Sequence, residues 1–263
     1  LLAWLNGDET AACSGAKIAP LLDVNEKQAD QRAYFEIKAV FQLDGSLLIR
    51  SETDAGKNAD TGHLHTLVNG ERVPVLPGSS LAGVLRHRAL RIANTLSANG
   101  TGSGLVNQIF GSSEKPLTAS RVSVNETVIK GTRQMVQNRV KIDRFTGGAY
   151  PTGLFGEQPL WGGADSRVTV ELRLRNPQDY EVGLLMLLLK DLWTSDLPVG
   201  GERNIGRGRL LGREATLDWQ TDGKKETWGI IPKEDGLQIT GELDKLEACV
   251  QALAKRLRGG RND

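Results

Sequence analysis

Residues 75–90 read Val-Leu-Pro-Gly-Ser-Ser-Leu-Ala-Gly-Val-Leu-Arg-His-Arg-Ala-Leu, so that a strand end, a Pro-Gly turn and an amphipathic helix follow without a break. Ser79 or Ser80 can cap such a helix with a side-chain oxygen, and Gly78 lets the backbone approach a ligand closely. The free N–H groups of a helix start favour an anion, and Arg86 adds positive charge along the same helix. The stretch predicts a helix over 80–97 with a phosphate contact at its start, although an ordinary capped surface helix fits the same residues.

Strand patterns on both sides of this helix indicate the fold. Apolar and polar residues alternate over 34–43 and 167–175, and shorter strand patterns occur at 122–124 and 211–219. Residues 180–193 form an apolar segment that is too long for most strands, which indicates a buried helix. The resulting order βαββαβ predicts an α+β fold of the ferredoxin-like, or RNA-recognition-motif-like, type.

The same patterns divide the chain into parts. Residues 34–220 form the predicted ferredoxin-like domain, which carries a long insertion at about 114–165 between its two middle strands. Residues 1–33 are interpreted as a linker or the tail of a preceding domain, and 221–263 as a C-terminal extension with an amphipathic helix that packs on its own domain or a neighbour. Because compact folds rarely keep long inserts without function, we expect the insertion to take part in binding.

Composition narrows the class of protein. With 263 residues, of which 39% are hydrophobic, the chain can bury a sizeable core. The net charge of +1 is no polyanion-binding signal, so any nucleic-acid binding must come from local patches. Cys13 and Cys249 lie far apart without metal-ligand spacing, which argues against a zinc site and for a reducing compartment. No apolar run reaches membrane length, and a cytoplasmic protein without a membrane partner is expected.

Four segments resemble a known family. Residues 73–86, Val-Pro-Val-Leu-Pro-Gly-Ser-Ser-Leu-Ala-Gly-Val-Leu-Arg, resemble the signature P-x-I-P-G-S-S-L-K-G-x-x-R of the CRISPR-associated RAMP superfamily, particularly the backbone subunits of type III effectors. Ile-Phe-Gly at 109–111, Lys-Ile-Asp-Arg-Phe-Thr-Gly-Gly-Ala at 141–149 and the glycine-rich run at 200–209 follow in the family's order. The resemblance covers roughly residues 34–220. It implies a ferredoxin-like fold, a guide CRISPR RNA and a target single-stranded RNA as ligands, and other RAMP effector subunits or domains as partners.

The insertion combines cations with aromatic rings. Arg139, Lys141 and Arg144 lie near Phe145 and Tyr150, a mixture that suits RNA because cations neutralise phosphates and rings stack on bases. A solvated loop with a few buried rings is the alternative. The resemblance implies a thumb-like hairpin that wedges into the guide–target duplex, with the three cations as RNA contacts.

The glycine-rich loop carries further candidate RNA contacts. Gly206 and Gly208 lack side chains that would keep backbone N–H groups from phosphate oxygens, and Arg203 and Arg207 supply charge. A flexible turn before a strand would look alike. The resemblance implies that this loop lies beside the guide RNA.

A loop at residues 51–65 holds the candidate catalytic groups. In catalytic type III backbone subunits, the resemblance implies an aspartate here that supports cleavage of the target RNA. Counting back from Pro77 places Asp60 closest to that position and Asp54 second. Asp60 could bind Mg2+ or another divalent cation or orient a 2′-hydroxyl, and Lys57 could stabilise phosphate charge and contact RNA. The alternative is that both aspartates are turn residues.

Two histidines in the same loop offer a rival chemistry. His63 and His65 could perform metal-independent acid–base cleavage, as in the guide-processing endoribonucleases of the superfamily. They lie two residues apart and are expected to point to opposite sides of an extended loop. Three functions stay open at this point: a target-cutting backbone unit, a non-catalytic RNA-binding scaffold, and a guide-processing endoribonuclease.

Overall fold

A six-stranded antiparallel sheet forms the centre of the computed structural model, which describes residues 32–52, 54–56, 59–97, 100, 102–221, 223–234 and 236–259. Its spatial order is β16-β15-β14-β1-β13-β7. The strands span β1 (Tyr34–Asp44), β7 (Val122–Val124), β13 (Val168–Arg175), β14 (Arg209–Thr221), β15 (Lys224–Lys233) and β16 (Gly236–Thr240).

Strict alternation along β1 places its apolar side chains on one face of this sheet. Ile37 lies opposite Leu172 of β13 and Leu217 of β14, and all three are buried. Such period-2 burial removes apolar surface from water on one side only. The buried residues of β1 and β13 are Phe35, Ile37, Ala39, Phe41, Leu43, Val168, Val170, Leu172 and Leu174.

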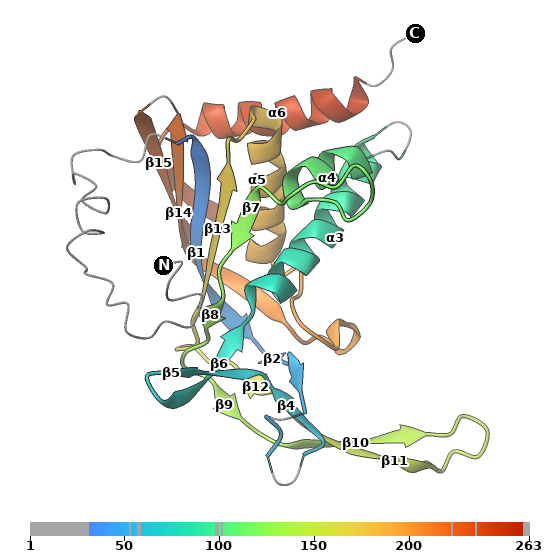
Figure 1. Ribbon diagram of the computed structural model, residues 1–263. Helices are drawn as coiled ribbons and strands as arrows, with labels where there is room; N and C mark the ends of the chain where they lie inside the picture. Colours follow the sequence, from blue (N-terminus) through green and yellow to red (C-terminus); the bar gives the residue numbers. More distant parts are fainter. Residues whose placement is uncertain are drawn as a thin grey trace, which may run out of the picture.

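Helices cover this apolar face (Figure 1). They are α3 (Gly78–Leu96), α4 (Ser103–Phe110), α5 (Asp179–Trp193) and α6 (Leu243–Arg258). The expected C-terminal amphipathic helix, α6, packs against α5 and buries Leu246, Cys249 and Leu253, so it contributes to the core of its own domain. Among the described residues, no helix is both long and apolar enough to cross a membrane.

The mixed α+β class predicted from the sequence is confirmed, although the structure contains elements that were not predicted. Leaving α4 aside, β1, α3, β7, β13, α5 and β14 follow one another in the predicted order βαββαβ, apart from short strands in the connections. The helix α4 and the strands β15 and β16, which widen the central sheet, were not predicted, nor were most of the short strands in the connections. The predicted linker lies almost entirely outside the described residues.

The insertion between the middle strands spans 125–167, because β7 ends at Val124 and β13 begins at Val168. Residues 114–121, which were predicted to belong to the insertion, lie before β7 and are not part of the insertion. Its longest part is a hairpin of two antiparallel strands that projects from the body (Figure 1). The insertion comprises β8 (Thr127–Val128), β9 (Arg133–Gln134), β10 (Gln137–Ile142), β11 (Ala149–Gln158) and β12 (Leu160–Trp161).

Five short strands lie between β1 and α3 in the described part of the chain. They are β2 (Ser46–Leu47), β3 (Arg50–Ser51), β4 (Thr61–His63), β5 (His65–Val68) and β6 (Glu71–Leu76). Two of them, β3 and β4, join the base of this hairpin in a second sheet with the order β10-β11-β4-β3, in which Thr61 of β4 pairs in parallel with Glu157 of β11. The candidate catalytic loop is thus attached to the hairpin.

Candidate nucleic-acid interface

The hairpin tip is a turn organised by one aspartate. Asp143 Oδ1 accepts the backbone N–H groups of Phe145 (2.7 Å) and Thr146 (3.3 Å), and the Asp143 N–H donates to Gly148 O (2.9 Å). A short acidic side chain that bonds the backbone two residues on is a common way to fix a turn. The turn leaves the Phe145 ring 100% exposed at the tip, next to the exposed Arg144.

Large apolar side chains stay exposed along both strands of the hairpin. Lys141 extends over the ring of Tyr150, with its Nζ 4.4 Å from the ring centroid. Exposed apolar side chains on a projecting element are typical of an interaction site, and rings close to cations suit a nucleic-acid strand. Besides Phe145, the exposed residues are Val140, Ile142, Tyr150, Leu154 and Phe155.

At the hairpin base, five charged side chains from four segments meet in an ion cluster. It consists of Arg50 on β3, Arg139 on β10, Glu157 on β11, and Glu202 and Arg207 of the glycine-rich loop. Arg50 Nη2 lies 2.9 Å from Glu202 Oε1 and 3.4 Å from Glu157 Oε1. Arg207 Nη1 lies 2.7 Å from Glu202 Oε2 and 3.1 Å from Glu157 Oε2. The cluster ties the glycine-rich loop to the hairpin.

The pKa values of the two carboxyl groups in the ion cluster are shifted in opposite directions. Burial, and then the hydrogen bond and charge of Glu202, raise the pKa of Glu157 above its ordinary value. Burial also opposes ionisation of Glu202, but its hydrogen bond to Glu157 and the positive charges of Arg207, Arg50 and Arg139 lower its pKa overall. The pKa of Glu157 is therefore raised and that of Glu202 lowered, and the two groups titrate as a pair.

Arg207 is the residue whose position differs most from expectation. Its side chain is buried, with only 2% of the residue exposed, and its Nη2 donates to Gln137 Oε1 (2.7 Å). The expected phosphate contact is corrected to an internal one, because the guanidinium faces two carboxylates and not solvent. Arg203 of the same loop is exposed, as are Lys141 and Arg144, while Arg139 is half-buried.

The glycine-rich loop uses its backbone N–H groups internally. Gly206 follows the 3-10 turn η2 (Arg203–Ile205) and donates its N–H to Arg203 O (3.1 Å), and Gly208 donates to Ser46 O (2.7 Å). Gly208 has φ +80°, and a Cβ there would lie 1.8 Å from Val199 O. Both glycines have a left-handed backbone, and Gly208 also permits close packing. Because their N–H groups donate internally, the expected presentation of these groups to phosphate is not seen.

Asp60 lies at the junction of the candidate catalytic loop and the hairpin. Its Oδ2 accepts the N–H of Gly156 on β11 (2.7 Å), and its own N–H donates to Gly156 O (2.8 Å). Asp60 is exposed. In the described part of the chain, no group of three or more His, Cys, Asp or Glu side chains is placed to hold a metal ion. Lys57 lies outside the described residues.

Asp54 has a different environment, although it lies in the same loop. Only 5% of its side chain is exposed; it forms an ion pair with Arg72 and accepts the His65 N–H at Oδ2 (3.2 Å). These contacts make it a structural residue of the loop. Asp60 is the more accessible of the two candidates.

The histidines also separate into different environments. His63 is fully buried, accepts the Ile49 N–H at Nδ1 (3.2 Å) and donates from Nε2 to Val75 O (2.9 Å). Burial lowers its pKa to about 4, so the ring is neutral. His65 bonds to His63 O and to Gln134, and the two ring centroids lie 6.2 Å apart. The expected opposite orientation is wrong, because side chains two residues apart in an extended chain lie on the same face and the rings of His63 and His65 are in edge contact.

The start of α3 is uncapped by a side chain. Its N-cap residue is Pro77, and neither Ser79 nor Ser80 makes the expected capping bond, because both already lie within the first helical turn. A Cβ at Gly78 would lie 2.1 Å from Val124 O, so the glycine lets the helix start pack onto β7. Ser79 is exposed and Ser80 is half-buried.

Arg86 joins two of the sequence segments quoted above. Its Nη1 donates to Gly111 O (2.6 Å) and its Nη2 to Asn107 Oδ1 (2.8 Å), at the end of α4. A cation that binds the last carbonyls of a helix stabilises its C-terminus. The Pro-Gly-Ser-Ser helix and the Ile-Phe-Gly segment are thus parts of one packed unit, beside a hollow of about 330 Å³ that Ser79 and Arg86 help to line.

Comparison with known protein families identifies the class to which this architecture belongs. The family model of the RAMP superfamily matches residues 43–210, which is more than half of the chain. The chain therefore belongs to the RAMP superfamily, whose members are CRISPR-associated, typically bind RNA and form multi-subunit complexes. None of the curated proteins matches the sequence.

Proposed function

We propose that this chain is a backbone unit of a CRISPR type III effector that binds a guide RNA and the guide–target duplex. Its central unit is then the superfamily's ferredoxin-like domain, and the hairpin β10–β11 is its thumb. One observation carries the proposal: a projecting hairpin exposes a ring and a cation, Phe145 and Arg144, at its tip. The partners are guide CRISPR RNA, target single-stranded RNA and neighbouring RAMP subunits or domains, in the cytoplasm.

Cleavage of the target RNA would use Asp60. An exposed carboxylate suits Mg2+, which commonly takes one or two protein carboxylates and completes its shell with water and substrate phosphates. Asp60 would supply one carboxylate to such a shared site, because it is an exposed acidic group at the hairpin base. When bound, the cation would stabilise negative charge on the scissile phosphate. Asp60 would hold the RNA strand and cation in place against the hairpin.

The two alternatives make different demands on the same residues. A guide-processing endoribonuclease would need an accessible histidine pair, whereas His63 is buried and neutral. A non-catalytic scaffold needs Asp60 only as the acceptor that fixes Gly156. The scaffold is therefore the stronger alternative.

The test separates charge from anchoring at one position. Asp60→Asn keeps an oxygen that can accept the Gly156 N–H but removes the negative charge, whereas Asp60→Ala removes both. In the assembled complex with Mg2+, we expect Asp60→Asn to slow cutting of a guide-matched RNA by roughly 100-fold or more. Binding should change by no more than about twofold, since phosphate contacts dominate the interface. Cleavage rates and filter binding measure the two effects.

Three controls make the result specific. Asp165→Asn, at an exposed aspartate of the insertion, should cut normally, and a chelator should stop the parent protein. Asp54→Asn tests the second candidate position. Normal cutting by Asp60→Asn would remove Asp60 from catalysis, and a parent protein that binds but never cuts would establish the scaffold.

A further inference from the structure

The face of the central sheet opposite the helices carries polar side chains. In the part of the chain that the structure describes, α3, α5 and α6 all lie on the other side (Figure 1). Residues of even number on β1 and of odd number on β13 point to this open face, and they include Tyr34, Glu36, Arg173 and Arg175. None of these residues belongs to the hairpin or to the Asp60 loop.

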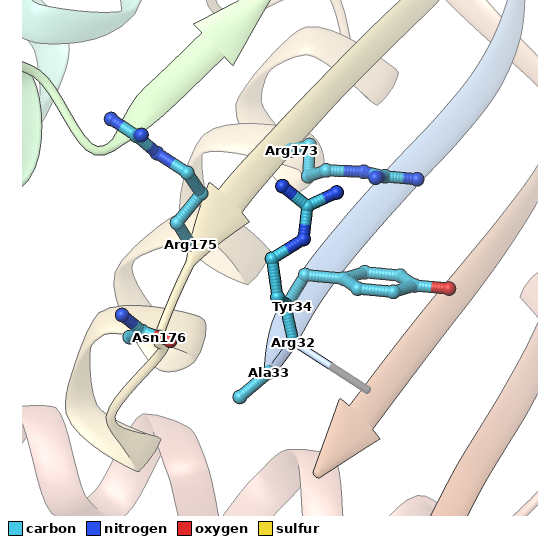
Figure 2. A pocket seen from close by; sticks show the side chains of 6 residues that line it. All are labelled: Arg32, Ala33, Tyr34, Arg173, Arg175 and Asn176. Carbon is cyan, nitrogen blue, oxygen red and sulfur yellow. The ribbon is translucent and has the colours of Figure 1, made fainter. Parts of the chain in front are cut away.

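A hollow of about 270 Å³ lies where β1 begins and β13 ends (Figure 2). Figure 2 shows the guanidinium groups of Arg32 and Arg173 beside the Tyr34 ring, with Arg175 on the neighbouring part of β13. No Asp or Glu is among the described residues that line it. The lining residues are Arg32, Ala33, Tyr34, Arg173, Arg175 and Asn176.

Internal contacts hold these side chains in place. The Arg173 guanidinium carbon lies 4.2 Å from the centroid of the Tyr34 ring, and Arg173 Nε donates to Glu36 Oε1 (2.9 Å). Arg175 Nη2 donates to Ser120 O (2.9 Å), and Arg121 bonds the backbone oxygens of Arg175 and Asn176. A flat ring and guanidinium that are ordered before binding lose little entropy when a ligand arrives.

The charge pattern along the open face limits where an anion can lie. The next hollow on this face shares Arg173 but is lined by Glu36 and Glu171 as well as Asn125. Carboxylates disfavour a phosphate there, so the arginine end is the position at which a phosphate gains the most. A ligand with one phosphate and a flat group matches this end, since rings and guanidinium planes stack on bases.

We propose that this hollow binds a nucleotide of single-stranded RNA, with its phosphate at the arginines and its base or ribose against the Tyr34–Arg173 stack. The site lies on the sheet and not on the hairpin, so it is a second RNA contact, distinct from the proposed thumb. It would hold a strand that runs outside the guide–target duplex.

The experiment measures binding of a fluorescein-labelled oligouridylate to the full chain as a function of salt. Tyr34→Ala should weaken binding about tenfold, and Tyr34→Phe, which keeps the ring, should bind like the parent. Arg175→Gln should reduce the slope of log K against log salt by about 0.7, because one phosphate contact is lost. Lys38→Gln, which removes a cation from the same face outside the hollow, should leave the slope unchanged.

Each contrary result overturns the site. Equal effects of Arg175→Gln and Lys38→Gln would show diffuse charge attraction only. Competition by a polyglutamate peptide as strong as that by unlabelled oligouridylate would show an acidic-peptide site. The same variants in a Phe145→Ala background separate this proposal from the thumb, because the Tyr34→Ala loss should persist there. If Tyr34→Ala does not fold, Arg175→Gln still decides.

Discussion

The base and the tip of the hairpin β10–β11 carry similar kinds of side chain and use them in opposite ways. At the base, Arg207 is buried against Glu157 and Glu202. At the tip, Arg144 is exposed and lies next to the fully exposed Phe145. The comparison teaches that the carboxyl groups around an arginine decide whether its guanidinium is bonded inside the fold or is available to RNA. The sequence motif in which the arginine occurs does not decide this.

The two regions also differ in how their backbone is held. The glycine-rich loop uses the N–H groups of Gly206 and Gly208 in bonds to Arg203 and Ser46, whereas the turn at the tip is held by the side chains of Asp143 and Thr146. The base is thereby a joint between two segments, and the tip is a presented surface. Variants at the base should change stability, and variants at the tip should change RNA affinity.

The largest effect is expected for Arg207→Ala. Removal of this guanidinium leaves two carboxyl groups buried without their closest cation, a change that typically costs about 3–5 kcal/mol of unfolding free energy. Urea unfolding followed by circular dichroism measures it. Arg203→Ala, in the same loop but exposed, should stay within about 0.5 kcal/mol of the parent protein. Equal losses from both variants would break the distinction between buried and presented arginines.

The next effect is a loss of stability in acid that originates at His63. Its pKa of about 4 in the folded state lies below the ordinary value of 6.5, so the unfolded chain binds the proton more readily. The stabilisation is complete above pH 6.5 and declines as the pH falls toward 4, by at most about 3 kcal/mol.

Unfolding free energies at pH 7 and pH 5 test the His63 prediction. His63→Gln should be less stable at pH 7 but should lose less than the parent between the two pH values. His87→Gln, at an exposed position on α3, should follow the parent. The assignment would be contradicted if the unfolding free energies of the parent protein and of His63→Gln were both the same at pH 7 and pH 5.

A variant at the hairpin tip is expected to have the smallest effect on stability but a clear effect on the affinity for RNA. Phe145→Ala should leave the melting temperature unchanged, because the ring has no contacts to lose. Its affinity for a guide–target duplex should fall by about 1–3 kcal/mol if the ring stacks on a base. Leu117→Ala, at an exposed apolar residue before the insertion, should change neither quantity. A lower melting temperature for Phe145→Ala would show that the tip folds against something.

The central sheet could be predicted because its signal is local. The alternation along residues 35–43 and 168–174 fixes which side chains are buried, and both strands appear where expected. The strands β15 and β16 were missed because they are the last two strands toward one side of the sheet, and Trp228 and Ile230 are the only buried side chains of β15. The short helix α4 has too few turns for a periodic pattern.

The candidate site could be predicted only in part. The hairpin could be predicted because residues 141–149 are consecutive and resemble a segment of the family as a motif. The ion cluster was not predicted, because Glu157 and Glu202 lie 45 residues apart in the sequence. From the sequence alone, each resembles a solvent-exposed loop residue. Long-range pairing of charges leaves no periodicity, so Arg207 was assigned to RNA when its partners were unknown.

Photocrosslinking from position 145 tests the central claim most directly. A benzoylphenylalanine in place of Phe145 should crosslink to the guide–target duplex in the assembled complex, at positions that recur at regular intervals along the RNA. The same photoreactive group in place of Leu117 should not crosslink. If the position-145 variant assembles with guide and target but gives no RNA crosslink, the hairpin is not the thumb that enters the duplex.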